Sequence, residues 1–335
     1  MISASMAEAG FRDALRLFQS DAAALRDPGP SLETTSAPPE PPRVVSSDVI
    51  ESTTLRAHRI ADPPVAGFDA FLDGAQESRV VHYCDGVPVV FGRVAAVIRQ
   101  RVLRRMVTWK RPDTRSRFYI PRSHVPAELW TRVVARGFDP FDTTDAHDAG
   151  ATDGSNADPH PFTLAQHALD AVKREREAAE RRLAEEWVAT RSEPIFIDGS
   201  IATSERIAAA PNVVGVIKSH RTLYVSGAAM RIVQALPVHH RSSVLKVSAY
   251  HRTAVASWYL RIREPTGRDP LWGLLRVETA MPDRSASPRD VADHANLISR
   301  WILAEMMPLS LPDSRWDKMV YGIHDCEEFL KSLRS

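Results

Sequence analysis

The sequence feature that most constrains the fold is a run of apolar, β-branched and aromatic segments between Phe68 and Leu103. Three segments follow one another, FDAFLDG, RVVHYCDG and VPVVFGRVAAVIRQRVL, and an Asp-Gly pair stands between each and the next. Asp-Gly between alternating apolar segments is a strong signal for a two-residue hairpin turn. The sequence therefore predicts three successive strands in an antiparallel meander.

The rest of the chain alternates predicted helices with predicted strands. The longest helix is expected from Thr163 to about Thr190, and the strand PIFIDGS follows it. The apolar stripe of this helix consists of Val172, Ala179, Leu183 and Trp187. Helices near residues 226–236 and 288–306 alternate with further strands, on one of which Glu278 is expected to pair with a neighbouring arginine. We therefore expect an α/β protein with a mixed β-sheet flanked by helices.

The order of these segments predicts three parts along the chain. Residues 1–26 carry apolar side chains at helical spacing, which predicts an amphipathic helix. Residues 27–64 form a predicted flexible linker, whose first half is dense in Pro, Ser and Thr. Residues 65–335 form the predicted folded domain, within which residues 139–161 are a polar loop without apolar periodicity.

Composition limits the class of protein. Of 335 residues, 44% are apolar and 25% are charged, as in a globular protein with a sizeable core. Two cysteines, Cys84 and Cys326, are too few for a disulfide scaffold, and they indicate a reducing compartment. The sequence has no apolar stretch of the roughly 18 residues that a bilayer span requires, and its N-terminal segment carries acids where a signal peptide is basic. We expect a cytoplasmic protein without a membrane anchor.

Two aspartates stand where an apolar strand is expected to give way to a glycine turn, Asp73 in AFLDG and Asp198 in IFIDGS. An ionised Asp at the exit of a buried strand is costly unless it is paired or bound to a metal. Gly74 and Gly199 allow the backbone to turn closely around whatever is bound there. An ordinary turn is the alternative for each Asp-Gly pair, and it is the preferred interpretation for Asp85.

Hydrolysis of a phosphodiester offers a role for such carboxylates. Two divalent ions about 4 Å apart activate the attacking water and stabilise the leaving oxygen, and Mg²⁺ or Mn²⁺ prefers carboxylate oxygens. Two aspartates are too few, so further ligands must come from elsewhere. In the long helix, Glu180 and Glu186 lie at the shoulders of the buried stripe, and Glu177 points outward. Glu180 can reach inward; alternatively it belongs to the solvated charge run around it.

In their order, these motifs resemble the NurA family of DNA-end-processing nucleases, whose domain has a ribonuclease H-like fold. The family pattern is a first strand ending in Asp-Gly, a helix with Arg-x-x-x-Glu, a strand ending in Asp-Gly-Ser, and a C-terminal segment with Tyr. This chain has FLDG at Asp73, Arg176 followed by Glu180, IFIDGS at Asp198, and YGIHDCEEFLK from Tyr321. The likeness runs from about residue 65 to the end, and its specificity lies in the order of these short motifs.

The resemblance implies a divalent-metal-dependent deoxyribonuclease. Asp73, Glu180 and Asp198 would be ligands of two Mn²⁺ or Mg²⁺ ions, and Tyr321 would lie near the site. The family has Tyr-Pro and then an Ala-His pair, whereas in this chain Gly and Ile separate Tyr321 from His324. Either His324 replaces the missing imidazole as a metal ligand, or the site is weakened.

The resemblance also implies partners and a role. NurA-type nucleases work as dimers with HerA-type hexameric ATPases that pump duplex ends into them, and this chain has no Walker A loop of its own. We therefore expect a homodimer that hydrolyses linear duplex ends or single strands together with such a translocase, in double-strand-break end resection and DNA repair. The alternative is a catalytically weakened DNA-binding or adaptor module that regulates the translocase.

A local basic segment offers a path for DNA, because the formal net charge of +1 gives no global attraction. Residues 99–117, RQRVLRRMVTWKRPDTRSR, are strongly cationic and suit phosphate contacts and base stacking. The predicted DNA-binding residues are Arg104, Arg105, Trp109, Lys110 and Lys218. The alternative for residues 99–117 is a solvated strand and loop edge.

Overall fold

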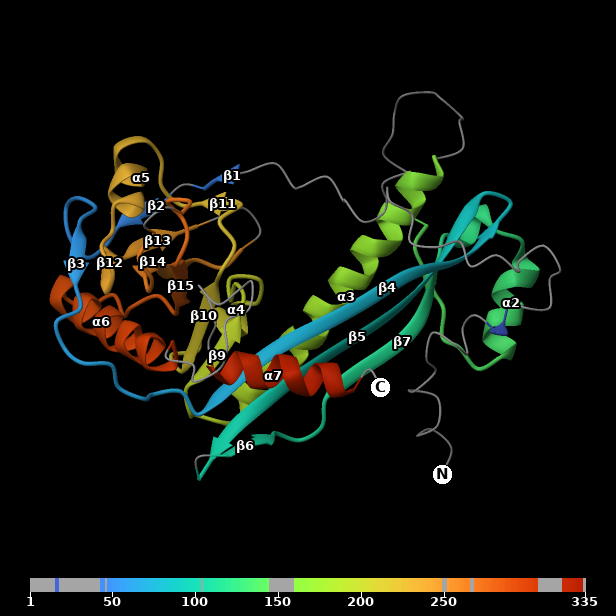
Figure 1. The fold of residues 1–335 in the computed structure, drawn as a ribbon, viewed down its shortest axis with the longest axis horizontal. Coiled ribbons are helices and arrows are strands. Elements are labelled where there is room, and N and C mark those ends of the chain that lie inside the picture. The colour runs from blue at the N-terminus through green and yellow to red at the C-terminus, as the bar shows by residue number, and fades with distance from the viewer. Residues whose placement is uncertain are drawn as a thin grey trace. The chain divides into compact units, whose positions relative to one another are not determined.

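The computed structural model describes a mixed α/β protein (Figure 1). The described residues are 16–17, 43–45, 47–103, 105–144, 160–248, 252–265, 268–306 and 321–333. The chain divides into two compact units: unit 1 comprises Met1–Pro39, Gly74–Ala96 and Pro112–Glu180, and unit 2 comprises Glu40–Asp73, Val97–Arg111 and Arg181–Ser335. The predicted single domain over residues 65–335 therefore contributes to both units. Most of the predicted N-terminal helix, residues 27–42 of the predicted linker and residues 145–159 of the predicted loop lie outside the described residues.

The strands are β1 Arg43–Val44, β2 Ser47–Val49, β3 Ala57–Arg59, β4 Ala70–Cys84, β5 Val87–Val102, β6 Arg105–Thr108, β7 Asp113–Ile120, β8 Phe141–Asp142, β9 Ile195–Asp198, β10 Val213–Ile217, β11 Thr222–Leu223, β12 His240–Ser242, β13 Leu245–Val247, β14 Val255–Arg261 and β15 Leu274–Thr279. The helices are α2 Ala127–Ala135, α3 Pro161–Thr190, α4 Glu205–Ala208, α5 Gly227–Gln234, α6 Pro288–Glu305 and α7 Tyr321–Ser332, with a 3₁₀ turn at Arg122–His124. Among the residues that the structure describes, none of these helices has an apolar stretch long enough to cross a bilayer.

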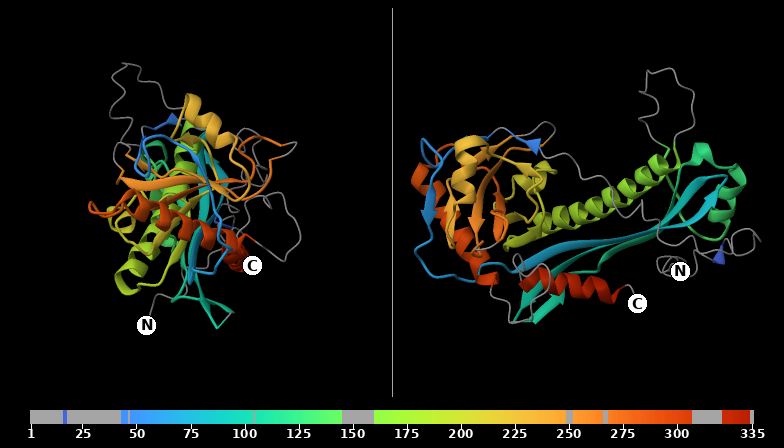
Figure 2. Two further views of the ribbon diagram at one scale, coloured as in Figure 1. Left: turned by 90° about the vertical axis from the view of Figure 1, so that its left-hand side faces the viewer. Right: turned by 45° about the horizontal axis from the view of Figure 1, so that its top comes forward.

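Unit 1 is a sheet with a helix on each face (Figure 2). Strands β4, β5, β7 and β8 lie side by side in this order. One apolar cluster joins Phe91 of β5 to Leu129 of α2, and another joins Val90 of the same strand to Val172 of α3. Because neighbouring residues on a strand point to opposite faces, α2 and α3 cover opposite sides of the sheet.

Unit 2 contains a large mixed sheet in the order β2-β13-β14-β15-β10-β9-β4. Strand β9 is parallel to both β4 and β10, whereas β15 pairs antiparallel with β10 and with β14. Helix α6 packs on this sheet, where Trp258 of β14 donates its indole N–H to Ser299 Oγ at 3.0 Å. Helix α7 packs on β4, where Gly322 lies against the ring of Phe71. A mixed sheet flanked by helices is the α/β class that the sequence predicts.

The predicted three-stranded meander between Phe68 and Leu103 is wrong in one respect. Asp85 and Gly86 form the expected turn, with φ angles of 50° and 85°, and they join β4 to β5. Asp73 does not end a strand, because β4 runs without interruption from Ala70 to Cys84. The first two predicted strands are therefore one strand, and β7 supplies the third strand of the meander.

The predicted linker also ends earlier than residue 64. Strand β2 pairs with β13, and β3 pairs with β12, so residues 47–59 belong to the sheet of unit 2. Strand β3 has the burial pattern exposed, intermediate, exposed, which gives it little apolar signal in the sequence. Polar contacts, rather than apolar periodicity, hold this segment.

Candidate carboxylate site

Asp73 and Asp198 are neighbours in unit 2 because their strands run parallel. Strands β4 and β9 pair in register, with Leu72 opposite Ile197 as the last pair. Asp73 and Asp198 are the next residues on the two strands, so both carboxylates point to the same side of the sheet. Strand β9 ends at Asp198, whereas β4 continues.

A buried carboxylate holds the loop that follows β9. Glu278 on β15 is fully buried, and its Oε2 accepts hydrogen bonds from Ser200 Oγ at 2.8 Å and from the backbone N–H of Ile201 at 3.1 Å. Its Oε1 accepts a hydrogen bond from the Tyr224 hydroxyl at 2.8 Å. Burial, and then the charge of Glu278, raise the pKa of Tyr224 well above its ordinary value, so this hydroxyl stays a donor. The predicted arginine partner, Arg276, is more distant, at 3.8 Å.

Two glycines give this loop its path. Gly199 has a φ of 145°, in a region that side chains disfavour. On β10, a Cβ at position 215 would lie 2.7 Å from the carbonyl oxygen of Gly199 and 2.8 Å from Ile201 Cγ2. Glycine at position 215 therefore lets the loop pack against β10. The serine of Asp-Gly-Ser is the sequence signal that could have revealed this clamp, since a hydroxyl next to a buried strand needs an acceptor.

Lys218, Arg105 and Arg104 are the predicted DNA-binding residues other than Trp109 and Lys110. Lys218 Nζ lies 2.8 Å from Asp198 Oδ2, and 24% of the Lys218 side chain is exposed. Lys218 therefore offsets the charge of Asp198 and still reaches solvent. Arg105 is exposed on β6, and Arg104 lies outside the described residues.

Trp109 is not available for base stacking, contrary to the prediction. Its side chain is 6% exposed, and its ring packs edge-on against Trp187 with centroids 5.2 Å apart. Lys110 forms an ion pair with Glu186, and its Nζ lies 4.6 Å from the centroid of the Trp109 ring. The tryptophan is a core residue because α3 supplies an aromatic partner, which the local sequence does not reveal.

Glu180 lies in unit 1, on α3. Its Oε1 occupies the space beside Gly74, so that a Cβ at this glycine would lie 2.1 Å from it. Arg176, one turn earlier, forms an ion pair with Glu180. The Glu180 side chain is 15% exposed and that of Glu177 is 49% exposed, as the helical stripe predicts. Glu180 thus contacts the residue that directly follows Asp73 in the chain.

Helix α7 packs on β4 through a face that contains none of the predicted site residues. Its buried residues are Gly322, Ile323, Cys326 and Leu330. Burial, and then the charge of Asp73, raise the pKa of the Cys326 thiol, so this face of α7 lies near Asp73. Tyr321 and His324 lie on the opposite side of the helix. Tyr321 is 52% exposed, and His324 Nδ1 is 3.8 Å from Glu327 of the same helix.

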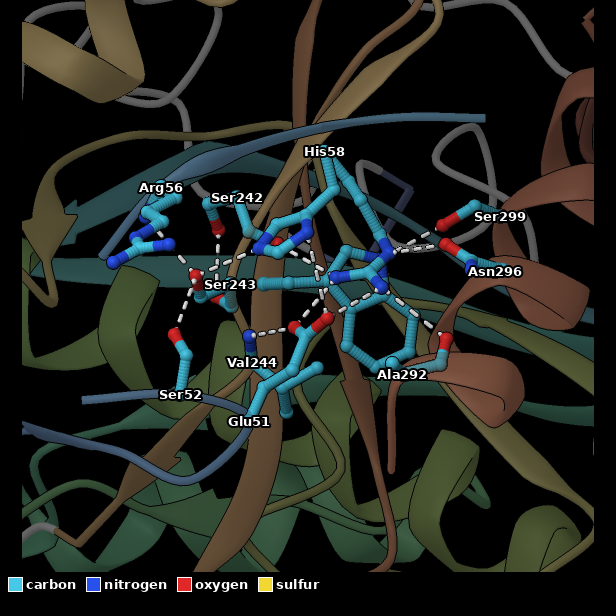
Figure 3. A network of polar contacts seen from close by, with 12 residues as sticks. Glu51, Ser52, Arg56, His58, Ser242, Ser243, Val244, Ala292, Asn296 and Ser299 are labelled. Atoms are coloured by element: carbon cyan, nitrogen blue, oxygen red, sulfur yellow. Dashed lines mark hydrogen bonds and ion pairs between the residues drawn. The ribbon is translucent and has the colours of Figure 1, made fainter. Parts of the chain in front are cut away.

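A second polar network joins β2 and β3 to the sheet of unit 2 (Figure 3). The buried Arg241 donates two hydrogen bonds to the Glu51 carboxylate, at 2.7 and 2.8 Å. His58 Nε2 lies 2.9 Å from Ser243 Oγ, and His58 Nδ1 lies 3.7 Å from Glu51. This order of serine, histidine and carboxylate suits a nucleophile, but Ser243 is 0% exposed and its Oγ accepts a hydrogen bond from the Arg56 backbone at 3.0 Å. The network is therefore an anchor for these two strands.

The donor chemistry of Asp73 and Asp198 fits a hard divalent ion, since both are carboxylates on adjacent parallel strands. Within the described part of the chain, no group of three or more His, Cys, Asp and Glu side chains is arranged to hold a metal ion. The adjacent pair thus supplies two ligands, and the others stay a prediction. No protein-family model and no curated protein matches this chain.

Proposed function

We propose that this protein is a divalent-metal-dependent deoxyribonuclease that hydrolyses phosphodiester bonds at DNA ends. The observation that carries the proposal is the pair Asp73 and Asp198, which continue two parallel strands in register. Two carboxylates on the same side of a sheet repel one another unless a cation or a proton lies nearby. Lys218 lies 2.8 Å from Asp198, and a bound divalent cation would be a counter-charge that both carboxylates share.

The order of elements supports a ribonuclease H-like fold as part of the proposal. Strands β4, β5 and β7 come first, helix α3 follows, and β9 and β10 then add parallel to β4 and to each other. This order agrees with the sequence of NurA motifs, in which the Arg-x-x-x-Glu helix lies between the two Asp-Gly strands. The fold alone does not establish the chemistry, so the site carries the proposal.

On this proposal Asp73 and Asp198 would hold Mn²⁺ or Mg²⁺, with Glu180 as the predicted third ligand. Tyr321 and His324 lie on the side of α7 opposite its packed face and take no part in it. When bound, the metal polarises the phosphate and lowers the pKa of the attacking water. Lys218, which contacts Asp198 and is partly exposed, can exchange this carboxylate for a phosphate oxygen. Glu278 keeps the loop after Asp198 in place.

The proposed partners are those implied by the resemblance to NurA. They are linear DNA, a second copy of the chain and a HerA-type hexameric ATPase. The translocase would deliver duplex ends to a nuclease that has no ATP-binding loop in its sequence. The proposed biological role is end resection in DNA repair.

Digestion of linear and circular DNA with Mn²⁺, with and without the ATPase, tests the proposal. We expect the wild type to degrade linear DNA and Asp73→Asn or Asp198→Asn to lose at least about 100-fold in rate, as removal of a group that stabilises the transition state does. Asp85→Asn is the matched control, because Asp85 sits in a hairpin turn with a φ of 50° that Asn tolerates. Full activity of both site variants would reject the nuclease.

A second candidate function is a DNA-binding or adaptor module that regulates the translocase without cutting. It is favoured by the cationic partners that two of the predicted ligands already have, Lys218 on Asp198 and Arg176 on Glu180. This function predicts binding to DNA and to the ATPase, and no hydrolysis with Mg²⁺, Mn²⁺, Ca²⁺ or Zn²⁺. The same digestion assay separates the two candidates.

A further inference from the structure

The hairpin of β5 and β6 in unit 2 has one covered face and one free face. Antiparallel pairing places Arg101 opposite Met106 and Val102 opposite Arg105. Paired side chains share a face, and faces alternate along a strand. Arg101 and Met106 therefore lie on one face, and Val102 and Arg105 lie on the other.

Two helices cover the first face through its arginines. Arg99 Nε lies 2.6 Å from Asp325 of α7, and Arg101 forms two hydrogen bonds of 2.8 Å with Glu305 of α6. These acids neutralise the two arginines, so this face contributes to stability. It leaves no charge to attract a ligand.

The second face combines apolar and cationic side chains in solvent. Val102 and Val107 are each 41% exposed, although β-branched side chains normally pack. Arg105, also exposed, lies between them on the same face. Arg99, Arg101 and Lys110 are ion-paired, but Arg105 and Arg111 are exposed, and the segment 99–111 contains no Asp or Glu. A polyanion is therefore the partner that the charge of this surface selects.

Leu103 at the tip of the hairpin is the most unusual residue of this surface. It is 92% exposed and has a φ of 48°. The left-handed conformation is unfavourable for a leucine, and here no packing offsets that cost. Asn or Gly would suit such a two-residue turn better. A backbone conformation that destabilises the folded protein without improving its packing points to a functional role for Leu103.

We propose that this hairpin binds duplex DNA as a two-stranded ribbon and inserts Leu103 between neighbouring base pairs. Two-stranded ribbons bind in either groove of DNA, and proteins that bind the minor groove use leucine among other apolar residues as a wedge between base steps. Arg105 contacts the phosphate backbone beside the wedge. The inference rests on the proposed nuclease function and adds to it a means of opening duplex ends.

Binding experiments in EDTA test the wedge without any cleavage. The probe is a short blunt duplex with 2-aminopurine near one end, whose fluorescence rises when the base unstacks. We expect wild-type protein to raise the fluorescence, Leu103→Asn to abolish the rise, and Arg105→Gln to keep it. The slope of log affinity against log salt should fall by about 0.9 in Arg105→Gln, the value for one lost phosphate contact, and stay unchanged in Leu103→Asn.

Leu297→Asn on α6 is the matched control, because Leu297 is an exposed leucine, 38% accessible, outside the hairpin. It should behave as wild type. Asn tolerates the backbone angle at position 103, so a loss of signal in Leu103→Asn does not come from unfolding.

Three results would overturn the proposal. They are a fluorescence rise that persists in Leu103→Asn, wild-type binding to the duplex without any rise, and binding to phosphatidylserine-phosphatidylcholine vesicles instead of DNA. Failure of the nuclease is a separate result, since a protein without Mn²⁺-dependent digestion can still give the fluorescence rise.

Discussion

At the scale of single residues, the same Asp-Gly dipeptide has three structural roles in this chain. After Asp85 it closes a hairpin turn, and Gly199 bends the loop behind β9 with a φ of 145°. Gly74 does neither, because it lies inside the continuous strand β4 and makes room for the carboxylate of Glu180. Glycine is thus required for its positive φ at positions 86 and 199, and for the absence of a Cβ at position 74.

The clamp on the loop after β9 predicts the effect of Glu278→Gln. A glutamine offers one acceptor oxygen where the carboxylate offers two. Either the Tyr224 hydroxyl loses its acceptor, or Ser200 Oγ and the Ile201 N–H both lose theirs. Each buried donor left without a partner costs about 1–3 kcal/mol. We expect urea unfolding to show a loss of this size. On the proposed function, calorimetric titration should also show weaker Mn²⁺ binding.

Ser200→Ala and Ser299→Ala separate positioning from general stability. Ser200 donates to Glu278, whereas the buried Ser299, on α6, accepts a hydrogen bond from the indole N–H of Trp258. Both changes should lower the free energy of unfolding by about 1 kcal/mol. Amide hydrogen exchange of the peptide around residues 199–201 should accelerate in Ser200→Ala alone. Equal exchange in the two variants would contradict the clamp.

At the scale of elements, the sequence correctly predicted helices and strands whose apolar side chains recur at a regular spacing. Helix α3 was expected from Thr163 to Thr190 and extends over Pro161–Thr190, since its apolar stripe repeats over many turns. Strand β9 and the hairpin turn at Asp85 were also found. The length of β4 was not predicted, because Asp73 and Gly74 have the sequence of a turn, whereas Gly74 lies within the strand and leaves space for Glu180 of α3.

Strands β2 and β3 were not predicted from the sequence, for a different reason. Their residues are mostly polar, and what fixes them is an ion pair with Arg241, which lies 190 positions along the chain from Glu51. A buried charge pair of this kind has no local signature, since neither partner is recognisable without the other. The same holds for the proposed ligand set, whose members come from separate parts of the chain.

This ion pair predicts strong and non-additive effects on stability. Glu51→Leu or Arg241→Met alone leaves the other buried charge without its partner, which costs about 3–5 kcal/mol. The double variant Glu51→Leu with Arg241→Met removes both charges and should recover most of this loss. A double-mutant cycle measured by urea unfolding checks it, and additive losses would show that the pair is not coupled.

At the scale of the whole molecule, charge is balanced overall and uneven locally. On the proposed function, a formal net charge of +1 leaves DNA binding to local cationic surfaces, of which the hairpin of β5 and β6 is one. Several ionisable groups are instead buried in the sheet of unit 2, where they serve stability. The pH dependence of unfolding therefore reports on the buried groups.

Stability should fall as the pH is lowered through the ordinary pKa of histidine. Burial, and then the charges of Arg241 and Arg56, hold the pKa of His58 below 6.5, although the charge of Glu51 opposes them. Burial alone lowers the pKa of His294. Below about pH 6.5 these two histidines thus bind protons in the unfolded chain but not in the folded protein, and the free energy of unfolding declines.

Glu51 adds a second, more acidic phase to this decline. Burial acts to raise the pKa of Glu51, but its hydrogen bonds and ion pair with Arg241 outweigh burial, so the pKa lies below 4.5. A carboxyl group with a lowered pKa stabilises the fold fully at any pH above its pKa in the unfolded chain, and this contribution is lost as the pH falls below about 4.5.

Urea unfolding at a series of pH values should therefore show a plateau above about pH 7.5 and two steps of loss below it. His58→Gln should reduce the first step, of which the share of His294 remains, whereas His239→Asn, at an exposed residue whose φ of 59° suits Asn, should leave it unchanged. An unchanged first step in His58→Gln would mean that folding does not lower the pKa of His58.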